Sequence, residues 1–154
     1  VYGPRQDPLS EYSAVVPIFI RCIIEGKSPR VFGDGEQSRD FTYVDDVVSA
    51  NLQAARAAGA AGAVLNVGCG ERHSLNVLLS LLQDMLGESV EPEYCDERPG
   101  DVMHSSADIA MAGARIGYKP RFSFEEGLKR TVQWYEGKEA TTFFLVDEPD
   151  VEEQ

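Results

Sequence analysis

The chain has 154 residues, of which 43% are hydrophobic and 26% charged, a balance typical of globular proteins. Its formal net charge is -12, and the sequence offers no basic face of the kind that a nucleic-acid-binding protein needs. No apolar run approaches the ~18 residues of a membrane span and no signal segment opens the chain, so the sequence predicts a cytoplasmic protein with neither a nucleic-acid nor a membrane partner.

The first part of the chain predicts one helix followed by two short strands. Pro17 suits the first turn of a helix that ends at Gly26. Residues 30–32 are expected to form a strand, and Gly33 and Gly35 predict a turn after it. The alternation of residues 39–43 predicts a second strand.

The middle of the chain predicts two helices with a buried strand between them. Asp45 or Asp46 is expected to cap the first helix, which fades into the Ala/Gly-rich residues 57–63. The apolar run of residues 63–67, bounded by glycines, predicts a buried parallel strand. Ser74 is expected to cap the second helix. The apolar positions are Val47, Val48, Leu52 and Ala55 in the first helix and Leu75, Leu78, Leu79, Leu82 and Leu86 in the second.

The last third continues the alternation of strand and helix. Residues 91–95 predict a strand, and residues 107–116 predict a helix closed by Gly117. Ser123 and Glu126 have the spacing of a capping box that opens a final helix. Because helices and strands alternate throughout, the sequence predicts an α/β fold.

Residues 139–154 differ from the rest, because they carry six acidic residues and no basic one. Such a stretch is typical of a solvated, disordered tail, with an interaction tail as the alternative. The sequence therefore predicts one compact body over residues 1–138 and an acidic tail over residues 139–154.

Cysteines and histidines offer no metal or disulfide framework. Cys22, Cys69 and Cys95 are scattered without a C-x-x-C pair, and His73 and His104 do not lie at metal-ligand spacing. We expect a reduced, cytosolic setting and no zinc site.

Two arginines and one aspartate are the strongest candidates for binding chemistry. Arg39 precedes an apolar, aromatic stretch, and Arg98 precedes a Pro-Gly turn that leads to Asp101. Guanidinium groups match the oxygens of a diphosphate through two parallel hydrogen bonds, which lysine cannot form. The alternative is that both arginines are exposed surface residues and that Asp101 is a turn residue.

Four stretches resemble the extended short-chain dehydrogenase/reductase family, most of all its bacterial UDP-N-acetylglucosamine and UDP-glucose 4-epimerases. They are VYGPRQDP at residues 1–8, YSAVVP at 12–17, VFGDGEQSRDF at 31–41 and GDVMHSSADI at 100–109. The resemblance implies the C-terminal portion of such an enzyme. That portion comprises the last strands and helices of the Rossmann domain and a small α/β substrate-binding domain, without the N-terminal NAD-binding domain.

The resemblance also implies a set of substrate-binding residues. Arg39 and Arg98 would hold the diphosphate of a UDP-sugar, and Asp101 would accept hydrogen bonds from the ribose hydroxyls. Ser105 would lie against C2 of the sugar, where a small residue leaves room for an N-acetyl group. The remaining residues are Ala14 and Val15 beside the diphosphate and sugar, Phe19 as an apolar wall or a core aromatic, and Arg30, Val31 and Phe32 with their backbone toward uracil.

NAD is the cofactor that the resemblance implies for the whole protein, and none is expected for this chain. The chain contains no G-x-x-G-x-x-G loop, and none of its six tyrosines is followed four residues later by lysine. We therefore expect a chain that is not catalytic by itself, from a homodimeric enzyme, and that self-associates through unpaired strand edges. The alternatives are a UDP-glucuronate decarboxylase, a nucleotide-sugar 4,6-dehydratase, a non-catalytic binding module and an inactive truncation.

Overall fold

The computed structural model describes residues 1–9 and 14–137. Helices and short strands alternate along it, as the sequence predicts for an α/β fold. The elements are α1 (Val15–Ile24), β1 (Arg30–Phe32), β2 (Ser38–Arg39), α2 (Val44–Arg56), the 3-10 turn η1 (Ala58–Ala60), β3 (His73–Ser74), α3 (Leu75–Leu86), β4 (Glu93–Cys95), α4 (Ala110–Ile116) and α5 (Phe124–Glu136). The predicted tail, residues 139–154, lies outside the described residues.

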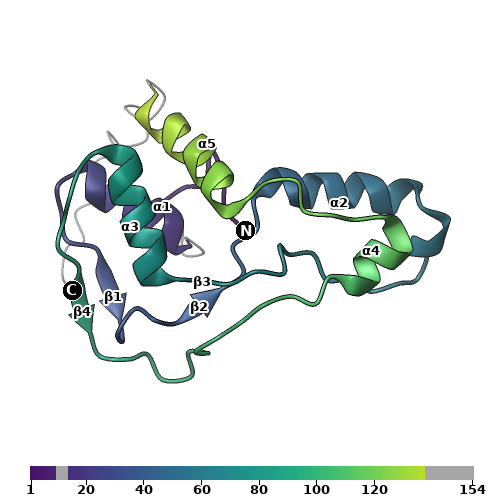
Figure 1. Ribbon diagram of the computed structural model, residues 1–154, viewed down its shortest axis with the longest axis horizontal. Coiled ribbons are helices and arrows are strands. Elements are labelled where there is room, and N and C mark those ends of the chain that lie inside the picture. The colour runs from purple at the N-terminus through teal and green to yellow at the C-terminus, as the bar shows by residue number, and fades with distance from the viewer. Residues whose placement is uncertain (10–13, 138–154) are drawn as a thin grey trace, which may run out of the picture.

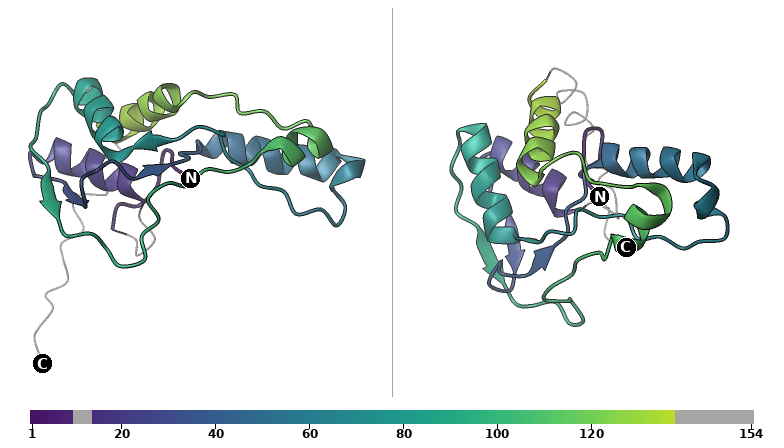
Figure 2. Two further views of the ribbon diagram at one scale, coloured as in Figure 1. Left: turned by 60° about the horizontal axis from the view of Figure 1, so that its bottom comes forward. Right: turned by 45° about the vertical axis from the view of Figure 1, so that its right-hand side comes forward.

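The molecule is elongated, with two groups of helices at opposite ends (Figure 1). Helices α1, α3 and α5 pack together at one end, and α2 and α4 form the other, an arrangement that both views of Figure 2 repeat. The larger core lies in the first group and contains Phe19, Ile20, Leu78, Leu82 and Leu128 among its buried side chains. A smaller core at the other end is built around Ala50, Ala112 and Tyr118.

Short strand pairs join distant segments near the first group of helices. Strands β1 and β4 are parallel, with Val31 opposite Tyr94. Strands β2 and β3 are antiparallel, with Arg39 opposite His73. A further parallel bridge places His104 beside Ser38 in β2. The segment after β4 is thereby drawn along β2.

Local signals predicted most helix ends correctly. The Ser74 hydroxyl accepts a hydrogen bond from the Val77 amide at the start of α3, and the Ser123 hydroxyl accepts one from the Glu126 amide at the start of α5. The Glu126 side chain does not complete a capping box, because it pairs with Arg130. Gly117 takes the left-handed conformation after α4, as expected of a helix-ending glycine.

Three predicted boundaries are wrong. Of residues 39–43, only Arg39 belongs to a strand, while Tyr43 makes an isolated bridge to Tyr2. Helix α2 begins at Val44 with Tyr43 as its N-cap, so neither aspartate caps it, and Asp46 is fully buried in its first turn. Helix α4 begins at Ala110 and not at residue 107. In each case a tertiary partner competes with the local signal.

Residues 63–67 do not form the predicted buried strand, and the side chain of Val64 is 90% exposed. A parallel strand needs a neighbour, and none of the strands in the described part of the chain lies beside this segment. Val48 and Leu52, two of the apolar positions named for the first helix of the middle region, are exposed on α2. None of the described helices is long and apolar enough to cross a membrane.

Gly127 lies where α5 meets two buried tyrosines. A Cβ atom at this position would collide with the Tyr2 hydroxyl and lie 3.1 Å from Cδ2 of Tyr43. We expect Gly127→Ala to lower the free energy of unfolding by about 1–3 kcal/mol through overpacking. Gly113→Ala in α4 is the control, because a Cβ there meets only one carbonyl oxygen, at 3.5 Å. Gly113→Ala should raise the free energy of unfolding by about 0.5–1 kcal/mol. Urea denaturation tests both, and shifts of the same sign would contradict the packing argument.

Candidate functional site

A cavity of about 570 Å³ lies between α1, β1 and the segment that follows β4. A second cavity of about 100 Å³ adjoins it and shares Phe32, Gln37, Arg98 and Asp101. Apolar side chains from α1 and β1 line one part of the larger cavity, and charged side chains line the other. Its lining residues are Val15, Ile18, Phe19, Cys22, Lys27, Ser28, Arg30, Phe32, Gln37, Arg39, Leu75, Arg98 and Asp101.

Strand β2 places Arg39 at this cavity, with both terminal nitrogens of its guanidinium group in polar contacts. Nη2 pairs with Oδ1 of Asp101 at 2.6 Å. Nη1 donates to the carbonyl oxygens of Ser38 at 2.9 Å and Met103 at 3.3 Å. The side chain is 28% exposed, so the charge is fixed in direction but open to the cavity.

Arg98 and Asp101 lie on one tight turn. The Asp101 amide donates to the Arg98 carbonyl oxygen at 3.1 Å, and Gly100 between them has a φ of +85°, which favours glycine. The Arg98 guanidinium carbon lies 3.7 Å from the centroid of the Phe32 ring, in a cation–π contact. The turn therefore brings two charged side chains to the end of β1.

The sequence did not single out several lining residues, of which Gln37 is the most informative. It is buried, and its Nε2 donates to the Phe32 carbonyl oxygen at 2.6 Å, which joins the end of β1 to the start of β2. Ile18 and Cys22 share the cavity-facing side of α1 with Val15, and helical spacing would have found them. Burial, with a smaller effect of the Glu25 carboxylate, raises the pKa of the Cys22 thiol, so it is neutral at pH 7.

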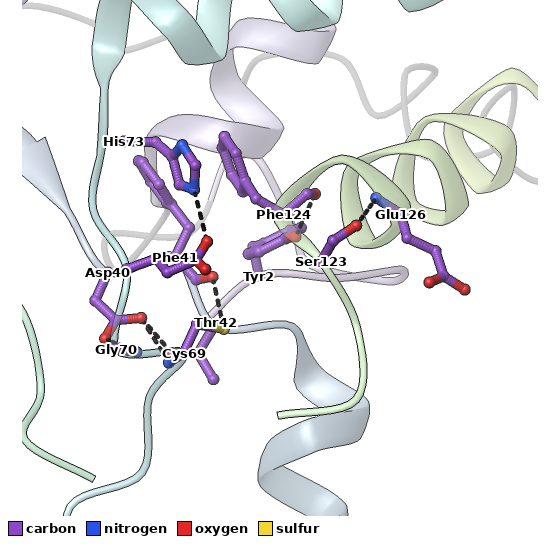
Figure 3. Close-up of polar contacts among 11 residues, drawn as sticks. Tyr2, Asp40, Phe41, Thr42, Cys69, Gly70, His73, Ser123, Phe124 and Glu126 are labelled. Atoms are coloured by element: carbon purple, nitrogen blue, oxygen red, sulfur yellow. Dashed lines mark hydrogen bonds and ion pairs between the residues drawn. The ribbon is translucent and has the colours of Figure 1, made fainter. Parts of the chain in front are cut away.

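The Asp40 carboxylate anchors the segments that flank the site. It accepts hydrogen bonds from the amides of Cys69 at 2.7 Å, Gly70 at 2.9 Å and Ala107 at 3.2 Å (Figure 3 shows the first two). Burial raises the pKa of the Cys69 thiol to about 11, and the negative charge of Asp40 adds to the rise. This anchor holds the chain just beyond Asp101 against β2.

Residues 68–70 are held by internal contacts, since the amides of Cys69 and Gly70 both donate to the Asp40 carboxylate. A Cβ atom at Gly68 would lie 2.6 Å from Cβ of Ala107 and 2.7 Å from Oδ2 of Asp40, so this glycine is required for internal packing. The described residues therefore offer no fit for NAD at this glycine pair.

Seven of the ten predicted site residues line the cavity: Val15, Phe19, Arg30, Phe32, Arg39, Arg98 and Asp101. Three do not line it. Ala14 is the N-cap of α1, Val31 is fully buried, and Ser105 is exposed with its amide donating to the Ser38 carbonyl oxygen at 3.0 Å. Phe19 is both a lining residue and a core aromatic, 1% exposed. The arrangement suits an anionic group attached to a flat or apolar one.

The fold is that of part of an extended short-chain dehydrogenase/reductase. The model of the NAD dependent epimerase/dehydratase family matches residues 1–68. It is 39% identical to a putative UDP-glucose 4-epimerase from Methanocaldococcus jannaschii, over 92% of this chain and 45% of that protein.

Two solved structures are similar to this chain. One is a UDP-glucose 4-epimerase from Thermotoga maritima with UDP-glucose, with a TM-score of 0.82. The other is a UDP-N-acetylglucosamine 4-epimerase from Methanobrevibacter ruminantium M1 with UDP-N-acetylmuramic acid, with a TM-score of 0.79. Both are 43% identical to this chain, and each match covers 88% of this chain and 43% of the other. The chain thus spans less than half the length of the relatives it matches.

Proposed function

We propose that the chain forms the nucleotide-sugar-binding part of an NAD-dependent UDP-hexose 4-epimerase that acts on N-acetylated UDP-hexosamines as well as on UDP-glucose and UDP-galactose. The observation that carries the proposal is the convergence of Arg39, Arg98 and Asp101 on one cavity, although about 60 residues separate the first from the other two.

The chemistry of the cavity matches the parts of a nucleotide sugar. Two guanidinium groups supply planar pairs of donors for the diphosphate oxygens. Asp101 is a hydrogen-bond acceptor for ribose hydroxyls. Phe19 and Phe32 supply an apolar wall for the base, and the backbone of β1 supplies donors and acceptors for the uracil edge. The amides at the start of α1, next to Ala14, suit an anionic oxygen.

NAD is proposed as the cofactor of the whole protein on the description of the family alone. Because the described residues do not offer a pyrophosphate loop, we assign no residue of this chain to NAD and derive no reaction step from it. What this chain does in the proposal is bind the nucleotide, orient the sugar and exclude solvent from it.

The activity can be tested on the whole protein with UDP-N-acetylglucosamine and UDP-glucose. We expect inversion at C4 of the sugar, observed by NMR as interconversion of the gluco and galacto forms. A 4-keto-6-deoxy sugar would instead indicate a dehydratase, and carbon dioxide released from UDP-glucuronate would indicate a decarboxylase. UDP binding without any turnover would favour a non-catalytic module.

The two arginines should dominate nucleotide affinity. We expect Arg39→Ala and Arg98→Ala each to weaken UDP binding by about 1.5–3 kcal/mol, the range for hydrogen bonds to charged groups. Lysine at either position should restore only part of the loss, because it lacks the two-pronged donor. Isothermal titration measures each affinity. Arg56→Ala, at the exposed end of α2, is the control and should leave UDP binding unchanged. Unchanged affinity in both site variants would contradict the assignment.

A further inference from the structure

The ion pair between Arg39 and Asp101 occupies the donor face that a diphosphate would use. Its Nη2–Oδ1 distance is 2.6 Å, and the Asp101 side chain is 46% exposed. The Nη1 edge of the same guanidinium group is bound to two backbone carbonyl oxygens. A phosphate oxygen that approaches Nη2 from the cavity therefore competes with the Asp101 carboxylate for this nitrogen.

Asp101 is the acceptor that can leave most easily. The two carbonyl oxygens belong to β2 and to the segment bridged to it, which are held by backbone hydrogen bonds between Ser38 and residues 103 and 105. Asp101 lies on the exposed Pro-Gly turn and contacts Arg39 through its side chain alone. A rotation of that side chain releases Nη2 without breaking any backbone contact.

The charges around the cavity favour the replacement of Asp101 by a diphosphate at Arg39. Lys27, Arg30, Arg39 and Arg98 line the cavity, and Asp101 is the single carboxylate among its described lining residues. A diphosphate carries more negative charge than one carboxylate, and it can also reach Arg98 on the same turn.

We propose that Asp101 is a positioning residue: it holds Arg39 in its binding direction in the empty cavity and gives up this place to the diphosphate when the nucleotide binds. This inference rests on the proposed function. The displaced carboxylate needs a new partner, and the hydroxyl groups of the nucleotide's ribose can provide one. Pyrophosphate, which lacks hydroxyl groups, must displace Asp101 without offering this partner.

Asp101→Asn is therefore expected to tighten the binding of one ligand and not of the other. The amide keeps the shape of the side chain but loses the charge that competes for Arg39. We expect the variant to bind inorganic pyrophosphate about two- to fivefold more tightly than the unmodified protein, which corresponds to the worth of a partly exposed ion pair. The same variant should bind UDP no more tightly, because the ribose loses a charged acceptor. If Asp101 had a purely structural role, the variant would bind both pyrophosphate and UDP more weakly.

Two further variants make the test specific. In Arg39→Ala, adding Asp101→Asn should produce no gain in pyrophosphate affinity. Glu97→Gln removes the same charge from a residue that lines the adjoining small cavity but has no described bond to Arg39, and it should leave pyrophosphate affinity within about a factor of 1.5. Circular dichroism checks that each variant is folded, and titration calorimetry on the whole protein measures both ligands.

The outcomes separate this inference from the proposed function. Unchanged or weaker pyrophosphate binding in Asp101→Asn overturns the inference, as does an equal gain in Glu97→Gln or a gain that persists without Arg39. If the unmodified protein binds pyrophosphate but not UDP, the proposed function fails, while the pyrophosphate series still decides the exchange. If it binds neither ligand, both fail.

Discussion

Ser105→Tyr is expected to abolish turnover of N-acetylated UDP-hexosamines while sparing UDP-glucose and UDP-galactose. The resemblance to the 4-epimerases implies that Ser105 lies beside C2 of the sugar, where a serine would leave space for an acetamido group and a tyrosine would fill it. A steric clash discriminates more strongly than one lost hydrogen bond, because the clash must be relieved before the substrate can bind productively.

The surroundings of Ser105 allow an effect on substrate choice to be distinguished from an effect on folding. Its backbone is held to β2, while its side chain is exposed, so a larger side chain displaces no core residue. The comparison of kcat/KM for both substrate classes is the measurement, and Ser106→Tyr, at the exposed neighbouring position, is the control. Equal loss on both classes, or no loss on either, would remove the argument that size at this position selects the substrate.

Asp46→Ala should be among the most destabilising substitutions in the protein. Asp46 is fully buried in the first turn of α2, and its carboxylate accepts hydrogen bonds from the amides of Arg121 at 2.9 Å and Phe122 at 3.4 Å. Alanine leaves both donors without this acceptor, at about 1–3 kcal/mol for each buried unsatisfied group. We expect the free energy of unfolding to fall by about 2–4 kcal/mol.

Asp45→Ala is the matched control for this substitution. Asp45 lies in the same turn but is exposed, so its removal costs only its favourable interaction with the positive end of the helix, about 0.3–1 kcal/mol. Urea denaturation measures both variants, with the slope of the transition checked for constancy. A similar small loss in both would mean that the buried carboxylate contributes no more than a surface one.

Features that depend on neighbouring residues could be predicted from the sequence. Ser74 and Ser123 cap their helices because a side chain and an amide three residues on satisfy each other locally. The leucine spacing of α3 was likewise enough to predict its buried face, in which Leu78 and Leu82 are fully enclosed. Gly117 ended α4 as expected, because its left-handed conformation is a property of one residue.

Features that depend on a distant partner could not be predicted. Residues 63–67 have the composition of a buried strand, yet composition does not supply the neighbouring strand that would pair with them. Asp46 has the position of a cap, but two amides some 75 residues away bind its carboxylate and bury it. Val48 and Leu52 are apolar at helical spacing, yet about half of each side chain is exposed.

The same distinction between local and distant contacts holds for the candidate site. The sequence by itself determined which side chains suit a diphosphate, because the two guanidinium groups and the turn that leads to Asp101 are visible in the order of residues. Only the tertiary structure decided that they meet. The parallel bridge from β2 to His104 and the hydrogen bond from the Ala107 amide to Asp40 draw the segment after β4 toward Arg39. Such contacts depend on chain segments that are far apart in sequence, so no local pattern encodes them, and the pairing of Arg39 with Asp101 follows from them.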